Sequence, residues 1–148
     1  MANQPAPGTC CAHLTANMSG TYFSIDSVGW QNGTAAWSNS AAFIYWTIST
    51  AYSVILLDDT NNSNVTWDGQ TTYAQHGGYF TQVSSYLNYF YTRNDSSAVI
   101  RGIAAHELGH AAGLDHSSIC PSVMWAYTDS CRATKPVFDD EEGIDALY

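Results

Sequence analysis

The sequence predicts an α+β domain, and three observations carry that prediction. Runs rich in β-branched and aromatic residues, 43–48 and 51–57, have the length and composition of strands. A long segment with helical periodicity, about 95–114, comes later, so strands precede the main helix. With 45% hydrophobic and only 11% charged residues, the chain 1–148 is expected to form a single domain rather than a disordered segment.

The first part of the chain is expected to contain an arm and a helix. Residues 1–20 are expected to form a loose N-terminal arm, because the prolines and glycine near its start resist regular structure. The spacing of Trp30 and Trp37 then predicts an amphipathic helix over 27–42.

The middle of the chain is expected to be mainly strand and loop. After the strands 43–48 and 51–57, residues 58–64 form a run of turn-forming side chains. Residues 65–78 have the pattern of an irregular loop, and 79–83 is expected to be a further strand.

The helix predicted over 95–114 begins at residues suited to capping, Asp95 or Ser96. Apolar residues line two of its faces, which is typical of a helix buried in the middle of a domain.

Charge and composition exclude some classes of partner. The chain has 4 Lys and Arg against 13 Asp and Glu, a net charge of −9, and its cations are too scattered to bind nucleic acid. No apolar run approaches the roughly 18 residues of a membrane span. A secreted monomer is expected, because four cysteines with little Lys suit an oxidising exterior; a cytosolic protein with free thiols is the alternative.

Residues 106–116, HELGHAAGLDH, form a motif that indicates a metal site. His106 and His110 are one helical turn apart, so both imidazoles can reach one zinc ion. Gly113 can take a positive φ, which ends the helix and lets His116 approach as a third ligand. Three protein ligands leave a coordination position open, which is typical of catalytic rather than structural zinc.

Glu107 is the candidate general base beside that open position. Zinc lowers the pKa of bound water to about 7, and Glu107 would take the proton of that water as it attacks a carbonyl. The protonated carboxyl could then protonate the leaving amine, which completes the hydrolysis of a peptide bond.

The motif resembles that of the metzincin zinc endopeptidases, in which a methionine turn lies beneath the zinc, and Met124 looks like that methionine. The sequence resembles the matrixin branch of this clan at three further positions. Ser117 follows the third histidine, and Asp139 and Asp140 lie in the final segment. The resemblance implies a twisted, mostly parallel sheet with an antiparallel edge strand, a central active-site helix and a C-terminal helix. It also implies that the two aspartates are scaffold carboxylates that anchor the methionine turn and the N-terminus.

A protein or peptide substrate is expected to lie along a sheet edge, which we place at the strand 79–83. Candidate substrate-binding residues are aromatic and either begin that strand or follow the methionine: Tyr79, Phe80, Trp125 and Tyr127. The alternative function is a secreted binding module that keeps a relict zinc site.

Calcium binding is weakly supported. Asp59, Asn61 and Ser63 imitate the first ligands of a calcium loop, but Asn64 and Gln70 stand where that loop requires Gly and Glu. A solvated turn is the favoured interpretation of this segment.

Four cysteines allow three pairings. Pairing Cys120 with Cys131 would force Cys10 to bond its neighbour Cys11 if all four are oxidised, and a bridge between neighbours is strained. We therefore expect Cys10 and Cys11 each to bond one of the other two, and the resemblance favours the same staple. The alternative is a single Cys120–Cys131 bridge with two free thiols.

Overall fold

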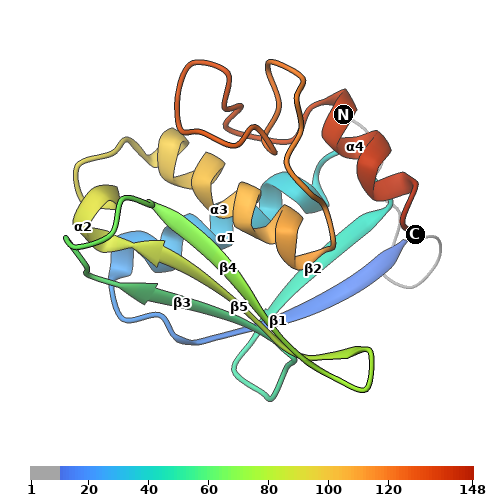
Figure 1. Cartoon of the computed structure of the whole chain (residues 1–148), viewed down its shortest axis with the longest axis horizontal. Coiled ribbons are helices and arrows are strands. Elements are labelled where there is room, and N and C mark those ends of the chain that lie inside the picture. Colours follow the sequence, from blue (N-terminus) through green and yellow to red (C-terminus); the bar gives the residue numbers. More distant parts are fainter. Residues whose placement is uncertain (1–10) are drawn as a thin grey trace.

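The computed structural model describes residues 11–148. A twisted five-stranded sheet carries helices α1 and α3 on one face, and α4 lies beside one end of that layer (Figure 1). The α+β class is therefore confirmed.

The sheet has the order β2-β1-β3-β5-β4. Four strands are parallel to one another, and β4 pairs antiparallel with β5 at the edge. This is the mostly parallel sheet with an antiparallel edge strand that the resemblance implies. The strands are β1 (Ala12–Gly20), β2 (Ile44–Ser49), β3 (Ile55–Thr60), β4 (Gly69–His76) and β5 (Tyr79–Asn88).

Two strands lie where the sequence predicts none. Residues 12–20, expected in a loose arm, form β1 in the interior of the sheet, while residues 1–10 of that arm lie outside the described part. Residues 65–78, expected to be a loop, contain β4. The strand expected at 79–83 runs on as β5, and it is an interior strand, so its assignment as the sheet edge is wrong.

The helices are α1 (Ser24–Ser38), α2 (Tyr89–Thr92), α3 (Ser97–Ala111) and α4 (Phe138–Asp145). The first begins and ends a few residues earlier than predicted. The predicted capping of α3 is confirmed, because the Ser96 side chain accepts a hydrogen bond from the backbone N–H of Val99. No helix in this part of the chain is long and apolar enough to span a membrane.

The core lies between the sheet and the two central helices. Trp30 and Trp37 of α1 are fully buried, together with Ile103 and Leu108 of α3. The indole Nε1 of Trp37 donates to the carbonyl of Ala105 at 2.8 Å, so α1 fixes the backbone of α3 within its middle turns. This contact positions the helix that carries the histidine motif.

A long loop joins α3 to α4 and lies over α3 (Figure 1). Within it Cys120 forms a disulfide with Cys131. The expected staple is therefore wrong, because neither cysteine is left to bond Cys11 or Cys10, and Cys10 lies outside the described residues. The two bonded residues are only 11 apart in sequence, and the loop brings them together around the methionine turn.

Candidate active site

Helix α3 and the turn that follows it assemble the three histidines. His106 and His110 lie one turn apart on α3, and Gly113 has a φ of +105° after the helix ends. That conformation favours glycine, and it turns the chain so that His116 returns toward the other two imidazoles. The structure thus brings together all three residues that the motif predicts as metal ligands.

The three imidazoles meet through their Nε2 atoms. The Nε2 of His110 lies 3.1 Å from that of His106 and 3.2 Å from that of His116. The Nδ1 atoms of His106 and His110 each lie 2.8 Å from a backbone carbonyl, those of Val123 and Leu114. A carbonyl only accepts hydrogen bonds, so Nδ1 carries the proton and Nε2 presents a lone pair.

Facing lone pairs repel each other unless a cation lies between them, and these nitrogens fit a zinc ion. Two nitrogens bound to tetrahedral zinc stand about 3.3 Å apart, close to the separations observed here. Burial, aided by the charge of Arg132, lowers the pKa of His106 to about 2, and burial lowers the pKa of His110. Both are therefore neutral near pH 7, which is the form that binds metal.

Glu107 is buried beside the histidines. Its Oε2 accepts a hydrogen bond of 2.6 Å from the Thr71 hydroxyl on β4. Burial raises its pKa to about 7, although the Thr71 hydrogen bond opposes that rise. A carboxyl with a pKa near neutrality can both accept and return a proton.

Met124 lies under α3. Its sulfur packs so closely on Gly109 that any larger residue at that position would collide with it. The carboxylate of Asp140, in α4, accepts hydrogen bonds from the backbone N–H groups of Val123 and Met124 at 2.9 and 3.1 Å. Asp140 thus holds the methionine turn in place.

Asp139 has a smaller set of contacts than Asp140. It accepts one hydrogen bond of 2.6 Å, from the hydroxyl of Ser117. That contact ties the start of α4 to the segment just after the third histidine.

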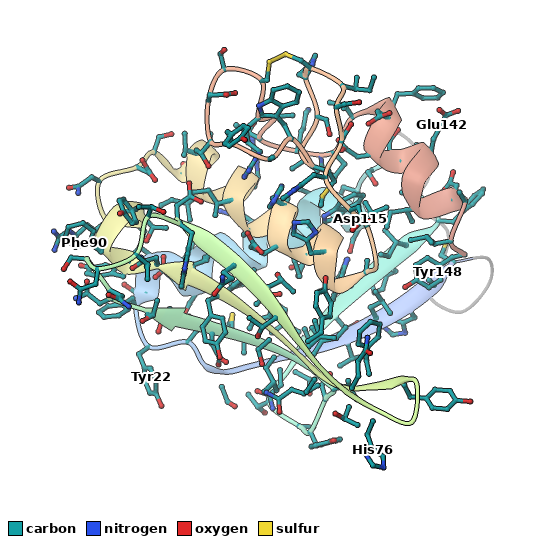
Figure 2. All side chains as sticks on the ribbon, in the orientation of Figure 1. Tyr22, His76, Phe90, Asp115, Glu142 and Tyr148 are labelled. Atoms are coloured by element: carbon teal, nitrogen blue, oxygen red, sulfur yellow. A yellow bond between two sulfur atoms is a disulfide. The ribbon has the colours of Figure 1, made fainter. Side chains whose placement is uncertain are left out.

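A cavity of about 990 Å³ opens beside the histidines. Tyr127 lines it, whereas Trp125, Tyr79 and Phe80 do not. Tyr79 and Phe80 lie at the tip of the β4–β5 hairpin, where they are exposed. Figure 2 shows His76 at that same tip, far from Asp115, which lines the cavity.

Sequence reasoning missed Thr71, Tyr73 and Arg132. Thr71 and Tyr73 are two apart on β4 and face α3, where the hydroxyl of Tyr73 donates to the carbonyl of His110 at 2.8 Å. The spacing of two between Thr71 and Tyr73 places both side chains on one face of a strand, and this was the signal in the sequence. The surrounding glycines and polar residues favour a loop instead. The residues around Arg132 in the sequence do not indicate that it lies in the cavity.

The calcium candidates lie at and after the end of β3. The Asp59 carboxylate accepts hydrogen bonds from the backbone N–H groups of Tyr22 and Phe23 at 2.9 and 2.6 Å. Among the described residues, the three histidines are the one group of three or more His, Cys, Asp or Glu side chains placed to hold a metal.

Comparisons with known proteins agree with this geometry. The matrixin family model matches residues 27–148. Metalloendoproteinase 2-MMP of Arabidopsis thaliana is 42% identical over 50 residues, covering 33% of this chain and 13% of the relative. Matrix metalloproteinase-9 of Canis lupus familiaris is 44% identical over 46 residues, covering 31% of this chain and 6% of the relative. The matches thus span only a small part of either relative.

The fold has a counterpart among solved structures. Metalloproteinase-II from Bacteroides fragilis superposes with a TM-score of 0.56 at 15% identity, covering 95% of this chain and 55% of that one. This likeness supports the metzincin-type fold, and the family model covers most of the chain. The chain belongs to the matrixin family of zinc metalloproteases.

Proposed function

We propose that this chain is a zinc-dependent endopeptidase that hydrolyses peptide bonds of extracellular proteins. His106, His110 and His116 would hold the zinc, and Glu107 would act as general base. The observation that supports this most directly is the convergence of three imidazole Nε2 atoms beside a buried carboxyl.

A zinc ion held there would supply Lewis-acid chemistry, polarising the substrate carbonyl and acidifying water. Glu107 keeps one oxygen on the Thr71 hydroxyl, which orients the carboxyl. Its other oxygen is then left to take a proton from the attacking water and to deliver it to the leaving amine. The Tyr73 hydroxyl, bonded to the carbonyl of His110, would hold the second ligand's backbone in position.

The substrate is proposed to bind along β4 rather than along the strand first expected. Among the described strands β4 pairs only with β5, so its outer edge can add an extended peptide through backbone hydrogen bonds. Gly69, Gln70 and Thr71 of this strand also line the cavity, so a peptide on the edge would pass the histidines. Tyr127 would form part of the wall that receives a substrate side chain.

Secretion and a monomeric state are also proposed. The Cys120–Cys131 disulfide supports secretion, because such bonds persist in oxidising compartments. Calcium is not required by the proposed mechanism.

The rival function, a binding module with a relict zinc site, predicts no turnover. Purified protein would be incubated with a denatured protein substrate, with and without a chelator, and the products separated by mass. Cleavage that the chelator abolishes and added zinc restores supports the peptidase. Metal-bound protein that leaves the substrate intact would favour the binding module.

A further inference from the structure

Arg132 is a cation in the same cavity as the three histidines. Its Nε donates a hydrogen bond of 2.7 Å to the carbonyl of Trp125, which fixes the start of the guanidinium. Its Nη1 is buried with no hydrogen-bond partner. Among the described residues no carboxylate forms a direct ion pair with it, although three acids lie close enough for their charges to favour its charged form. The guanidinium is thus partly withdrawn from water with acids nearby but none bonded to it.

A partly buried guanidinium with unbonded donors lowers the stability of the fold unless another group binds it. A guanidinium keeps its proton at any ordinary pH, so it cannot escape the cost of burial by becoming neutral. Three acids stabilise its charge at a distance without bonding it directly, and each accepts a hydrogen bond from another residue. These acids are Asp68, Glu107 and Asp129.

We propose that Arg132 binds a carboxylate of the substrate, so that the enzyme prefers peptides with an acidic group close to the cleaved bond. This inference rests on the proposed peptidase function. The planar guanidinium matches the two oxygens of a carboxylate, which makes it a better partner for that group than for a neutral amide. The carboxylate could come from an Asp or Glu side chain or from the free C-terminus of a short peptide.

The remaining charge of the molecule would oppose this preference. The chain carries a net charge of −9, and Asp68, Asp95 and Asp115 line the same cavity. Long-range electrostatics would therefore repel an acidic peptide. A preference for acidic peptides would have to come from a local contact, for which Arg132 has unused donors.

Arg93 provides a matched control in the same cavity. Its guanidinium carbon lies 4.9 Å from the centre of the Phe90 ring, and its side chain is exposed. Replacing either arginine by glutamine removes one positive charge from the cavity wall, but only Arg132→Gln removes the partly buried cation.

The test uses the full chain loaded with zinc and a set of quenched peptides. One Glu is placed in turn at each of the two positions on either side of the cleaved bond, and each peptide has a Gln twin. A second set carries either a free C-terminal acid or an amide. The readout is the ratio of kcat/KM for the acidic peptide to that for its neutral twin. Each ratio is measured on one enzyme preparation, so a variant that folds only in part still reports its preference.

We expect a ratio of about ten or more for at least one acidic peptide, the size of a charge-assisted hydrogen bond. If the raised ratio appears in the Glu peptides, the carboxylate that Arg132 binds is a side chain. If it appears in the peptides with a free C-terminal acid, that carboxylate is the C-terminus. Arg132→Gln should bring the ratio to about one or below, and Arg93→Gln should preserve it.

Two results would overturn the inference while leaving the peptidase intact: neutral peptides cleaved as fast as every acidic twin, or a preference that both arginine variants lose equally. Failure to cleave any peptide would instead count against the proposed function itself.

Discussion

Single hydrogen bonds decide which nitrogen of His106 and of His110 faces the metal position. Because backbone carbonyls accept hydrogen bonds from the Nδ1–H groups of these two residues, both Nε2 lone pairs turn inward. The motif predicts which residues meet, since a spacing of four is one helical turn. The carbonyl of Val123 belongs to a distant loop, so this part of the site could not be predicted from spacing.

Asp26 is a buried acid outside the active site. Its Oδ1 accepts a hydrogen bond from the Thr92 hydroxyl at 2.6 Å, and its Oδ2 has no donor. Burial raises its pKa from 3.8 to about 6; the Thr92 hydrogen bond opposes this, and the charge of Asp59 adds to it. The native state therefore binds the proton more tightly than the unfolded chain does, and this residue's contribution to stability falls as pH rises from about 4 through 6.

Asp26→Asn should remove that pH dependence. Relative to that of the natural chain, the free energy of unfolding of the variant should rise by up to about 3 kcal/mol between pH 4 and pH 8, because only the natural chain loses stability over this range. Urea unfolding at several pH values measures the difference. An offset between the two proteins that stays constant with pH would contradict the assignment.

Between elements, the most consequential contact is that of α4 with the methionine turn. Asp140 is buried and accepts hydrogen bonds from Ser122, Val123, Met124 and Val137. Asp140→Ala leaves buried backbone donors unsatisfied, so the free energy of unfolding should fall by about 3–4 kcal/mol. Asp139→Ala is the matched control, with an expected loss of about 1 kcal/mol because it breaks one contact. Equal losses in urea unfolding would show that Asp140 does not anchor the turn.

The disulfide closes the loop that contains this turn. A bridge between residues 11 apart should stabilise the fold by about 3 kcal/mol in the chain-entropy treatment. Replacing both Cys120 and Cys131 by serine should lower the free energy of unfolding by that amount. Non-reducing peptide mapping should recover one peptide pair joining the two cysteines, and a pair joining either of them to Cys10 or Cys11 would refute this connectivity.

At the level of elements, the sequence predicts the buried, strongly patterned segments best. Helix α3 and strand β2 match the prediction closely, because apolar periodicity reflects burial. The pattern of β1 does not predict a strand, because most of its residues are small or polar, with Leu14 and Met18 the exceptions, and its pairing partners lie far along the chain. Strand β4 was missed because an edge strand exposed along most of its length needs little apolar pattern.

Across the whole molecule, the sheet, the helix pair and the long loop place one cavity over the histidine motif. The sequence predicts the metal ligands and the base from a motif of eleven residues, 106–116, and the resemblance to the family rests in addition on Ser117, Met124 and the two aspartates at 139 and 140. It does not predict the cavity wall, since β4, the α2 region and the loop after Met124 meet there only in the fold. Arg132 is the clearest example, because its buried Nη1 without a hydrogen-bond partner is a property of the assembled cavity.

Glu107→Ala separates proton transfer from metal binding when zinc content, by atomic emission, and cleavage of a denatured protein are measured on the same samples of the variant and the natural chain. We expect about one zinc per chain in both proteins and a loss of at least about 100-fold in turnover for the variant, because Glu107 moves protons without holding the ion. His110→Ala is the control and should lose the zinc itself. Cleavage by Glu107→Ala at the natural rate would show that Glu107 is not the general base.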